Sequence, residues 1–289
     1  MKYYLKEEFL HDNNAKNAGN KARNDVEEIV KKARKRGIKI NFIIHDLDAL
    51  RFMNGQAVPL KHRIRMKIQE SGLLAEADGI IAHNPIMKSV LVDKGIAADK
   101  IVSLGIFDYL IPDFQEKSGQ TKDQPIIVAG NLAQEKAGYL YTLPEAPAYN
   151  LYGVGFDETR ALANETYFGS FLPDELPVAL EGGFGLVWDG DSAETCSGVF
   201  GEYLRYNNSH KASLYLASGF PLVVWKQSAL SHFVLEKDCG IAVESLHDLK
   251  ATIDNLSETD YQGLVDNARR VGQEIREGHY LKTALKHLS

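Results

Sequence analysis

Lys211 has the setting that most directly indicates chemistry in this sequence. It lies near the start of an apolar segment, 210–218, that is expected to be a helix with Asn208 or Ser209 as its N-cap. A lysine in the first turn opposes the helix dipole, so its charge suits an anionic partner such as a phosphate. Capping alone explains Asn208 and Ser209, and the phosphate-site prediction therefore depends on Lys211.

Glycines occur where two strands of the same half of the chain are expected to end. Gly130 and Asn131 follow one strand, and Gly153 and Gly155 follow the next. Glycine lets backbone amides approach a base or a phosphate closely. Either motif taken alone is better explained as a tight turn, but both lie in the same half as Lys211.

His45 and Asp46 come directly after the β-branched run 38–44, which is typical of a strand buried on both faces. Because ligands of open α/β sheets bind at the carboxyl ends of strands, these side chains are candidates for an acid–base pair. A histidine that is hydrogen-bonded without taking part in chemistry explains the pattern equally well.

Asp189 and Asp191 also follow an expected strand and are separated by one glycine. Acidic pairs of this kind can hold a divalent metal on a diphosphate. The three-residue match is weak, and glycines and a lysine are available for phosphate in the same half of the chain. We therefore expect a solvated loop or a contact with an acceptor here, and no metal site.

The composition is typical of a soluble globular protein. The 289 residues carry a formal net charge of −6, which argues against broad nucleic-acid binding. The start does not resemble a signal peptide, and the longest apolar stretch, 212–225, falls short of the roughly 20 residues that span a bilayer. Two cysteines without ligand spacing support neither a disulfide framework nor a zinc site. We expect a cytoplasmic protein with reduced thiols.

Expected strands and helices alternate along nearly the whole chain, as in parallel sheets with crossover helices. The pattern predicts an α/β protein with two Rossmann-like doubly wound domains, 1–112 and 125–272, joined by a polar linker over 113–124. Neither contains GxGxxG or the P-loop pattern, which argues against hydride transfer and P-loop hydrolysis. Ligands are expected in the cleft where the strand ends converge.

Five segments resemble one family of enzymes, the bacterial β-1,6-galactofuranosyltransferases. The same group includes the accessory glucosyltransferases, once called nucleotide sugar synthetase-like proteins, that extend glycans on serine-rich-repeat adhesins. The similarity covers nearly the whole chain. The segments are FIIHDLDALR at 42–51, AHNP at 82–85, GIFDY at 105–109, GFGLVWDGD at 183–191 and YNNSHK at 206–211.

The resemblance implies a GT-B fold, with a C-terminal helix over 273–289 that crosses back to the N-terminal domain. It also implies a metal-independent hexosyltransferase without a cofactor, which moves galactofuranose or glucose from a UDP-sugar to a hydroxyl of a cell-surface glycan or glycoprotein. In such an enzyme, Lys211 and nearby amides would stabilise the UDP leaving group, and His45 or Asp46 would act as base. Peripheral membrane association and a homo-oligomer stay open.

Carried over residue by residue, the resemblance places the donor site on three glycine-containing loops and on the start of one helix. Lys136 would substitute for an arginine expected near Gly130. The first glycine loop contributes Gly19 and Asn20, and the C-terminal half contributes Gly130, Asn131, Gly153, Gly155, Tyr206, Asn207, Asn208, His210 and Lys211.

One departure from the family concerns the first domain. Members usually have an additional strand before the equivalent of 38–44, so we expect only about four strands here, including one at 1–5, near the low end for sheets. This shortening motivates an alternative function, a non-catalytic UDP-sugar-binding or scaffolding subunit. An enzyme that hydrolyses or epimerises sugar nucleotides is a weaker alternative.

Overall fold

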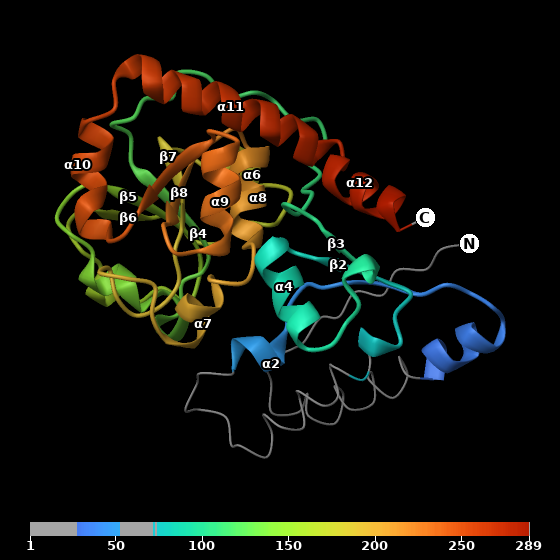
Figure 1. Cartoon of the computed structure of the whole chain (residues 1–289). Helices are drawn as coiled ribbons and strands as arrows, with labels where there is room; N and C mark the ends of the chain where they lie inside the picture. Colours follow the sequence, from blue (N-terminus) through green and yellow to red (C-terminus); the bar gives the residue numbers. More distant parts are fainter. Residues whose placement is uncertain (1–27, 53–71, 73, 289) are drawn as a thin grey trace. The chain divides into compact units, whose positions relative to one another are not determined.

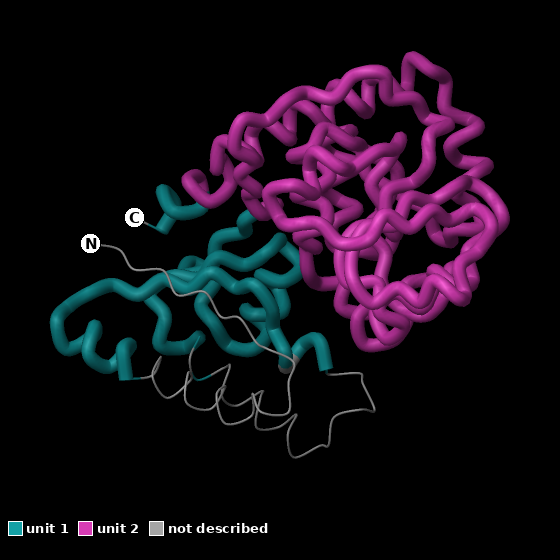
Figure 2. Tube along the Cα trace, turned by 180° about the vertical axis from the view of Figure 1, so that it is seen from behind, with its two compact units in different colours: residues 1–104, 284–289 teal, residues 105–283 magenta. Residues whose placement is uncertain are grey.

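Parallel strands connected by helices make up both parts of the chain, which confirms the predicted α/β class. This computed structural model describes residues 28–52, 72 and 74–288. Figure 2 shows its two units: unit 1 comprises residues 1–104 and 284–289, and unit 2 comprises residues 105–283. The domain limits inferred from the sequence, at 112 and 125, stay predictions.

The described part of unit 1 contains a three-stranded parallel sheet in the order β1-β2-β3. The central strand β2 is buried at every position, and its Ile80 pairs with Phe42 of β1 and Ile101 of β3. The predicted strand 1–5 lies outside the described residues. The elements are β1 (Asn41–Ile43), α2 (Asp48–Arg51), β2 (Gly79–Ala82), α4 (Pro85–Asp93), a 3-10 helix (Ala98–Lys100) and β3 (Ile101–Ser103), preceded by a helix over 28–35.

Local signals set the ends of these elements. Asn84 caps α4 by accepting a hydrogen bond from Met87 N at 2.9 Å, and Pro85 has the fixed φ that suits the first turn of a helix. The last residues of the chain also belong to this unit. A Cβ on Gly79 of β2 would lie 2.7 Å from Leu288 Cδ2, so Leu288 packs directly against the strand.

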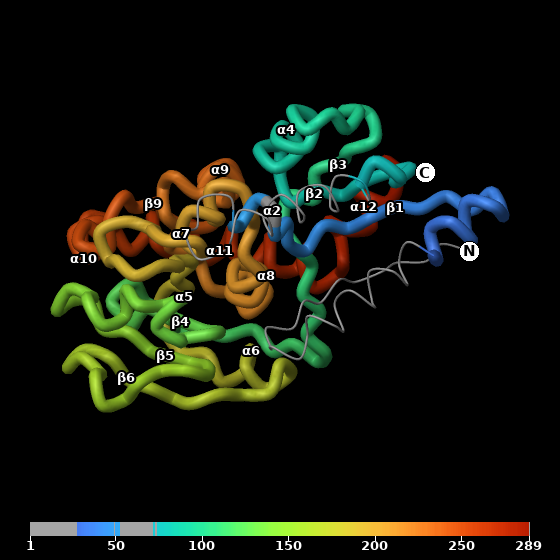
Figure 3. Tube along the Cα trace, turned by 90° about the horizontal axis from the view of Figure 1, so that it is seen from below, coloured from blue at the N-terminus to red at the C-terminus, as the bar shows by residue number. Residues whose placement is uncertain are grey.

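Unit 2 contains a six-stranded parallel sheet in the order β6-β5-β4-β7-β8-β9. Figure 1 labels its strands β4 to β8. Figure 3 shows β4, β5 and β6 side by side. The elements are β4 (Ile126–Asn131), α5 (Gln134–Ala137), β5 (Tyr149–Val154), β6 (Glu165–Tyr167), α6 (Leu176–Ala179), β7 (Phe184–Val187), α7 (Gly198–Tyr203), α8 (His210–Ala217), β8 (Leu222–Trp225), α9 (Ala229–Glu236), β9 (Gly240–Val243), α10 (Leu249–Asp254) and α11 (Glu258–Arg276), with 3-10 helices at Gly138–Thr142, Glu158–Arg160 and Leu246–Asp248. The last helix, α12 (His279–His287), begins in unit 2 and continues into unit 1 from residue 284.

The sequence pattern missed or overextended several helices of unit 2. The helices α5, α7 and α9 were not predicted, because two of them are short and α9 begins only three residues after the buried strand β8. The pattern of the sequence predicts a helix over 173–180, whereas the structure has only the single turn of α6, with Pro177 in its first turn. The pattern also predicts one helix over 246–256, and the structure divides this segment into a 3-10 turn and α10.

The core of unit 2 includes α8, which packs against β7 and against α11. Residues 212–217 of α8 are all buried, as expected of an apolar helix covered on two sides. The two helices approach each other closely at Gly272, where a Cβ would lie 2.1 Å from Leu216 O. Ser257 begins α11 through a capping box with Asp260, whose N donates to Ser257 Oγ at 3.1 Å.

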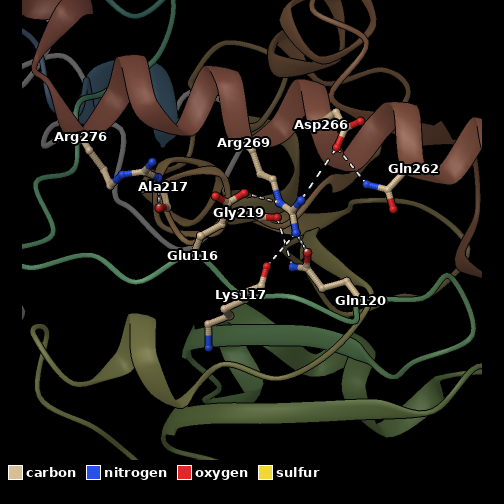
Figure 4. A network of polar contacts seen from close by, with 9 residues as sticks. All are labelled: Glu116, Lys117, Gln120, Ala217, Gly219, Gln262, Asp266, Arg269 and Arg276. Atoms are coloured by element: carbon tan, nitrogen blue, oxygen red, sulfur yellow. Dashed lines mark hydrogen bonds and ion pairs between the residues drawn. The ribbon is translucent and has the colours of Figure 1, made fainter.

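The predicted linker, 113–124, lies in unit 2 and is bonded to it along its length. Figure 4 shows Arg269 of α11 reaching this segment, where its guanidinium donates to Lys117 O at 2.7 Å and to Gln120 Oε1 at 3.1 Å. The Lys117 ammonium donates in turn to the carbonyls of Val178 and Leu180, at 2.7 and 2.6 Å. Residues 113–124 are therefore part of the second folded unit.

Candidate functional site

The strand order of unit 2 creates a switch point beside β4. The chain runs from β4 outward to β5 and β6, and then returns to β7 on the other side of β4. In open α/β sheets, ligands bind outside the carboxyl ends of the strands at such a point. Gly130 and Asn131 end β4, while Trp188 and Asp189 directly follow β7, so both pairs lie at the switch point.

Lys211 reaches the switch point from the first turn of α8. Its Nζ donates hydrogen bonds to Trp188 O and to Asp189 Oδ1, each at 2.8 Å. Its aliphatic stem passes Gly130, where a Cβ would lie 3.8 Å from Lys211 Cδ. The anionic partner expected for a lysine at a helix start therefore includes a carboxylate of the chain itself.

The burial of Asp189 shows that the prediction of a solvated loop after β7 was wrong at this residue. Only 9% of its side chain is exposed, because it follows the fully buried Trp188 and the loop folds back onto the unit. Gly190 N donates to Lys136 O at 2.8 Å, and Tyr139 N donates to Gly190 O at 3.1 Å. The neighbouring acidic residue of the sequence motif is exposed, and its contact with an acceptor stays a prediction.

Uncharged side chains are buried near this ion pair. Burial, with the negative charge of Asp189 as a further cause, raises the pKa of Tyr139 well above its ordinary value, and burial also raises the pKa of Tyr215. The Tyr215 hydroxyl accepts a hydrogen bond from Ala129 N at 2.7 Å. Burial likewise raises the pKa of the Cys196 thiol. All three groups are therefore uncharged at neutral pH.

Close backbone packing accounts for two of the candidate glycines. Gly153 pairs with Gly130, and a Cβ at position 153 would lie 1.8 Å from Gly130 O. A Cβ on Gly155 would lie 2.9 Å from Ala133 N. Gly130 has a φ of +125° and faces the stem of Lys211. A phosphate contact stays a prediction for all three, and it has the most room at Gly130.

The turn before α8 brings several candidate residues together. Ser209 is the N-cap, and its Oγ accepts a hydrogen bond from the amide two residues further on at 3.4 Å. Asn208 is buried and donates from Nδ2 to Gly105 O. The His210 ring stacks on Phe107 with 4.1 Å between ring centroids. The segment that opens unit 2 thus supports the start of α8.

The other unit 2 candidates have varied surroundings. The buried Oδ1 of Asn207 has no hydrogen-bond partner among the described residues, so it can accept a hydrogen bond from a ligand. Tyr206 is half-buried. Asn131 Oδ1 accepts a hydrogen bond from the backbone amide two residues on at 2.9 Å, as in a tight turn. The Lys136 ammonium lies 5.6 Å from the centroid of the Phe200 ring.

The candidates in the first part of the chain belong to unit 1. His45 is half-buried at the carboxyl end of β1. Asp46 forms an ion pair with Arg51, whose Nη1 also lies 3.7 Å from Asp48 Oδ1. The remaining candidates, at positions 19 and 20, lie outside the described residues.

Two partners of the candidate residues were not apparent from the sequence. Asp189 was discounted as a weak metal motif, although a lysine that opposes a helix dipole and an acidic residue after a buried strand of the same sheet were both visible. Arg51 is the last residue of the segment FIIHDLDALR, but no sequence pattern connects it with Asp46. In each case the missing information was which side chains meet in space.

The described residues offer neither a cluster of metal ligands nor a membrane-spanning helix. Residues 28–52, 72 and 74–288 contain no group of three or more histidine, cysteine, aspartate or glutamate side chains placed to hold a metal ion. Activity without a metal stays a prediction. In the same part of the chain, no helix combines the length and apolar character that crossing a membrane requires.

Solved structures with similar folds show which fold the chain has. Sucrose-phosphate synthase from Thermosynechococcus elongatus matches with a TM-score of 0.59 and 15% sequence identity, covering 86% of this chain and 67% of that one. HepE from Anabaena, in complex with UDP, matches with a TM-score of 0.55 and 11% identity, covering 88% and 74%. With parallel α/β sheets in both units, the chain has the GT-B fold of glycosyltransferases.

Sequence comparisons identify the family. The family model described as the glucosyltransferase 3-like C-terminal domain matches residues 126–288, and the corresponding N-terminal model matches residues 27–106. Beta-1,6-galactofuranosyltransferase WbbI of Escherichia coli (strain K12) is 36% identical over 249 residues, which are 85% of this chain and 70% of that protein. The chain belongs to the glucosyltransferase 3-like family, which confirms the resemblance, and it is a glycosyltransferase.

Proposed function

We propose that this enzyme transfers a hexose, galactofuranose or glucose, from a UDP-sugar to a hydroxyl of a cell-surface glycan or glycoprotein. The observation that carries the proposal is the ammonium of Lys211, which hydrogen bonds fix at the switch point of the unit 2 sheet. A cation and open backbone at this place suit a diphosphate. The named activity of WbbI and the UDP in the HepE complex support this donor class.

Lys211 has a role in the chemical step as well as in binding. Negative charge develops on the UDP leaving group as its bond to the sugar breaks. Lys211 and the amide groups in the first turn of α8 provide positive potential for this charge, and electrostatic preorganisation of this kind is often the largest catalytic contribution. Its two hydrogen bonds hold the ammonium in place before the donor binds, which is not so for a lysine side chain in water.

His45 is the better candidate for the base that accepts the proton of the acceptor hydroxyl. The carboxylate of Asp46 is engaged by Arg51, and protonating it would break that ion pair. A histidine has an ordinary pKa near neutrality and can accept a proton at physiological pH. We expect His45→Ala to lower turnover more than Asp46→Asn does, and the opposite order would assign the base to Asp46.

The first experiment measures thermal stabilisation by UDP, with ADP, GDP and NAD as comparisons. A ligand at about 100 times its dissociation constant adds roughly 2.7 kcal/mol to the stability of the folded state. We expect stabilisation by UDP alone. Equal stabilisation by all four, or by none, would contradict the proposed donor site.

Turnover then separates the transferase from a subunit that only binds nucleotide. UDP-galactofuranose and UDP-glucose are each incubated with acceptor glycans, and UDP release and glycan mass are followed. Loss of one preorganised donor group costs roughly 100-fold in turnover in comparable sites, so we expect about that loss for Lys211→Ala. The comparisons give no support to the non-catalytic alternative, which predicts UDP binding without product.

A further inference from the structure

Asp189 places a negative charge where an anionic donor is expected to bind, and its role therefore needs a physical explanation. Its Oδ1 accepts a hydrogen bond from Lys211 Nζ at 2.8 Å, and only 9% of the Asp189 side chain and 16% of the Lys211 side chain are exposed. A carboxylate repels a diphosphate, so direct binding of the phosphate does not explain it. Its contact is with the cation that would bind the phosphate.

Lys211 benefits from this contact because its side chain is long and flexible. A lysine side chain carries about 2 kcal/mol of rotamer entropy, so an unanchored ammonium occupies many positions. Hydrogen bonds to Trp188 O and Asp189 Oδ1 use two of its three N–H donors. With two donors fixed, the third is confined to a narrow range of directions at the switch point.

The framework that carries Asp189 is rigid enough to define this position. The preceding Trp188 is fully buried, and its Nε1 donates to Ser192 O at 2.9 Å. The following Gly190 is packed so closely that a Cβ would lie 2.4 Å from Ser197 O. Because the residues on both sides are fixed, the carboxylate has little freedom to move with the lysine.

We propose that Asp189 is the positioning residue for Lys211. It holds the ammonium at the switch point with the remaining N–H directed at the donor phosphate, and it makes no contact with the donor itself. This inference rests on the proposed function, because it requires a phosphate-containing donor. Since the charge on the leaving group develops in the transition state, misplacing Lys211 affects kcat more than the affinity for UDP.

A double-mutant cycle in the full chain tests the proposal. Asp189→Ala, Lys211→Met and the double variant are compared by initial rates with the UDP-sugar donor and by calorimetric titration with UDP. We expect Asp189→Ala alone to lower kcat about 10-fold while changing the Kd of UDP less than about 3-fold. In the Lys211→Met background the same substitution should change kcat less than about 2-fold, because no lysine remains to be positioned.

Two further variants separate positioning from general damage to the fold. Asp189→Asn keeps an oxygen acceptor in the same place, so we expect it to restore most of the turnover that Asp189→Ala loses. Glu194→Ala is the matched control, since this acidic side chain is exposed, lies five positions further along the same loop, and has its Oε2 3.7 Å from Nε2 of the exposed His247. It should turn over at the wild-type rate.

Each outcome has a distinct meaning. An equal loss from Asp189→Ala with and without Lys211 would overturn the positioning role, because the carboxylate would then act independently of the lysine. Wild-type kcat in Asp189→Ala, or a loss confined to the Kd of UDP, would also overturn it. A wild-type chain that neither binds UDP nor consumes a UDP-sugar would reject the proposed function, and the inference with it.

Discussion

Arg269 of α11 gives the most specific stability prediction. Its guanidinium donates to Lys117 O at 2.7 Å and to Gln120 Oε1 at 3.1 Å, and 26% of the side chain is exposed (Figure 4). It also forms ion pairs with Glu116 and Asp266, whose side chains are 61% and 65% exposed. Replacing Arg269 with alanine removes the contact with Asp266 inside α11 and the three contacts with the segment before β4, at Glu116, Lys117 and Gln120.

The expected loss follows from the exposure of each partner. Exposed ion pairs contribute little to the free energy of unfolding, so the pairs of Arg269 with Glu116 and Asp266 are taken to add almost nothing. A hydrogen bond with a charged donor contributes about 1.5–3 kcal/mol, and the two bonds, taken at the lower end because 26% of the Arg269 side chain is exposed, give a loss of about 3 kcal/mol for Arg269→Ala. Arg270 on the same helix is exposed and bonds to Asn267, so Arg270→Ala should stay within about 0.5 kcal/mol of wild type.

Tryptophan fluorescence is the suitable assay. The chain has two tryptophans, Trp188 and Trp225, and both are fully buried in unit 2. Urea unfolding followed by this signal therefore reports the unit to which Arg269 belongs. A midpoint for Arg269→Ala equal to that of Arg270→Ala would refute the reasoning, since the segment would then be held by its other contacts.

Three more predictions concern backbone, thiols and metal. Gly153→Ala should destabilise the chain by more than about 3 kcal/mol in urea unfolding, because the added Cβ would lie 1.8 Å from Gly130 O. At Gly263 in α11 an added Cβ has no atom within 4 Å, so Gly263→Ala should stabilise the chain by about 0.5 kcal/mol. Burial raises the pKa of the Cys239 thiol to about 12, above its ordinary value of 9.0, so neither it nor the buried Cys196 should react with iodoacetamide at pH 8 until urea unfolds the chain. The free energy of unfolding should fall as the pH rises from 9.0 to about 12, because the Cys239 thiol loses its proton at a lower pH in the unfolded chain than in the folded one. Transfer activity should survive EDTA, and loss that added Mg²⁺ restores would contradict metal-independent transfer.

The strands of unit 2 were predictable because their residue types carry the information locally. A run such as Ile126 to Ala129 is apolar throughout and ends in glycine, which is what a strand buried on both faces requires. The apolar run 240–243 likewise predicts a strand, and β9 has those limits. Short helices such as α5 and α7 have too few turns to show a periodic pattern, and their place depends on neighbouring loops.

The candidate site was predictable only in part. The start of α8 was visible, because a cap and a lysine stand at a recognisable helix boundary. Whether Asn208 or Ser209 was the cap could not be decided, because Asn208 is instead committed to Gly105, far away in the sequence. The same limit applied to Arg269, whose partners lie about 150 positions earlier in the chain.

By itself, the sequence determined the α/β class, the alternation of strands and helices, and the membership of a glycosyltransferase family, since these depend on local patterns and extended motifs. Only the tertiary structure decided that Lys211 meets Asp189 between β4 and β7, and that Asp46 is held by Arg51. Strand order and loop packing bring these charges together. An ion pair forms where side chains meet in space, and a buried one persists only when its geometry compensates for desolvation.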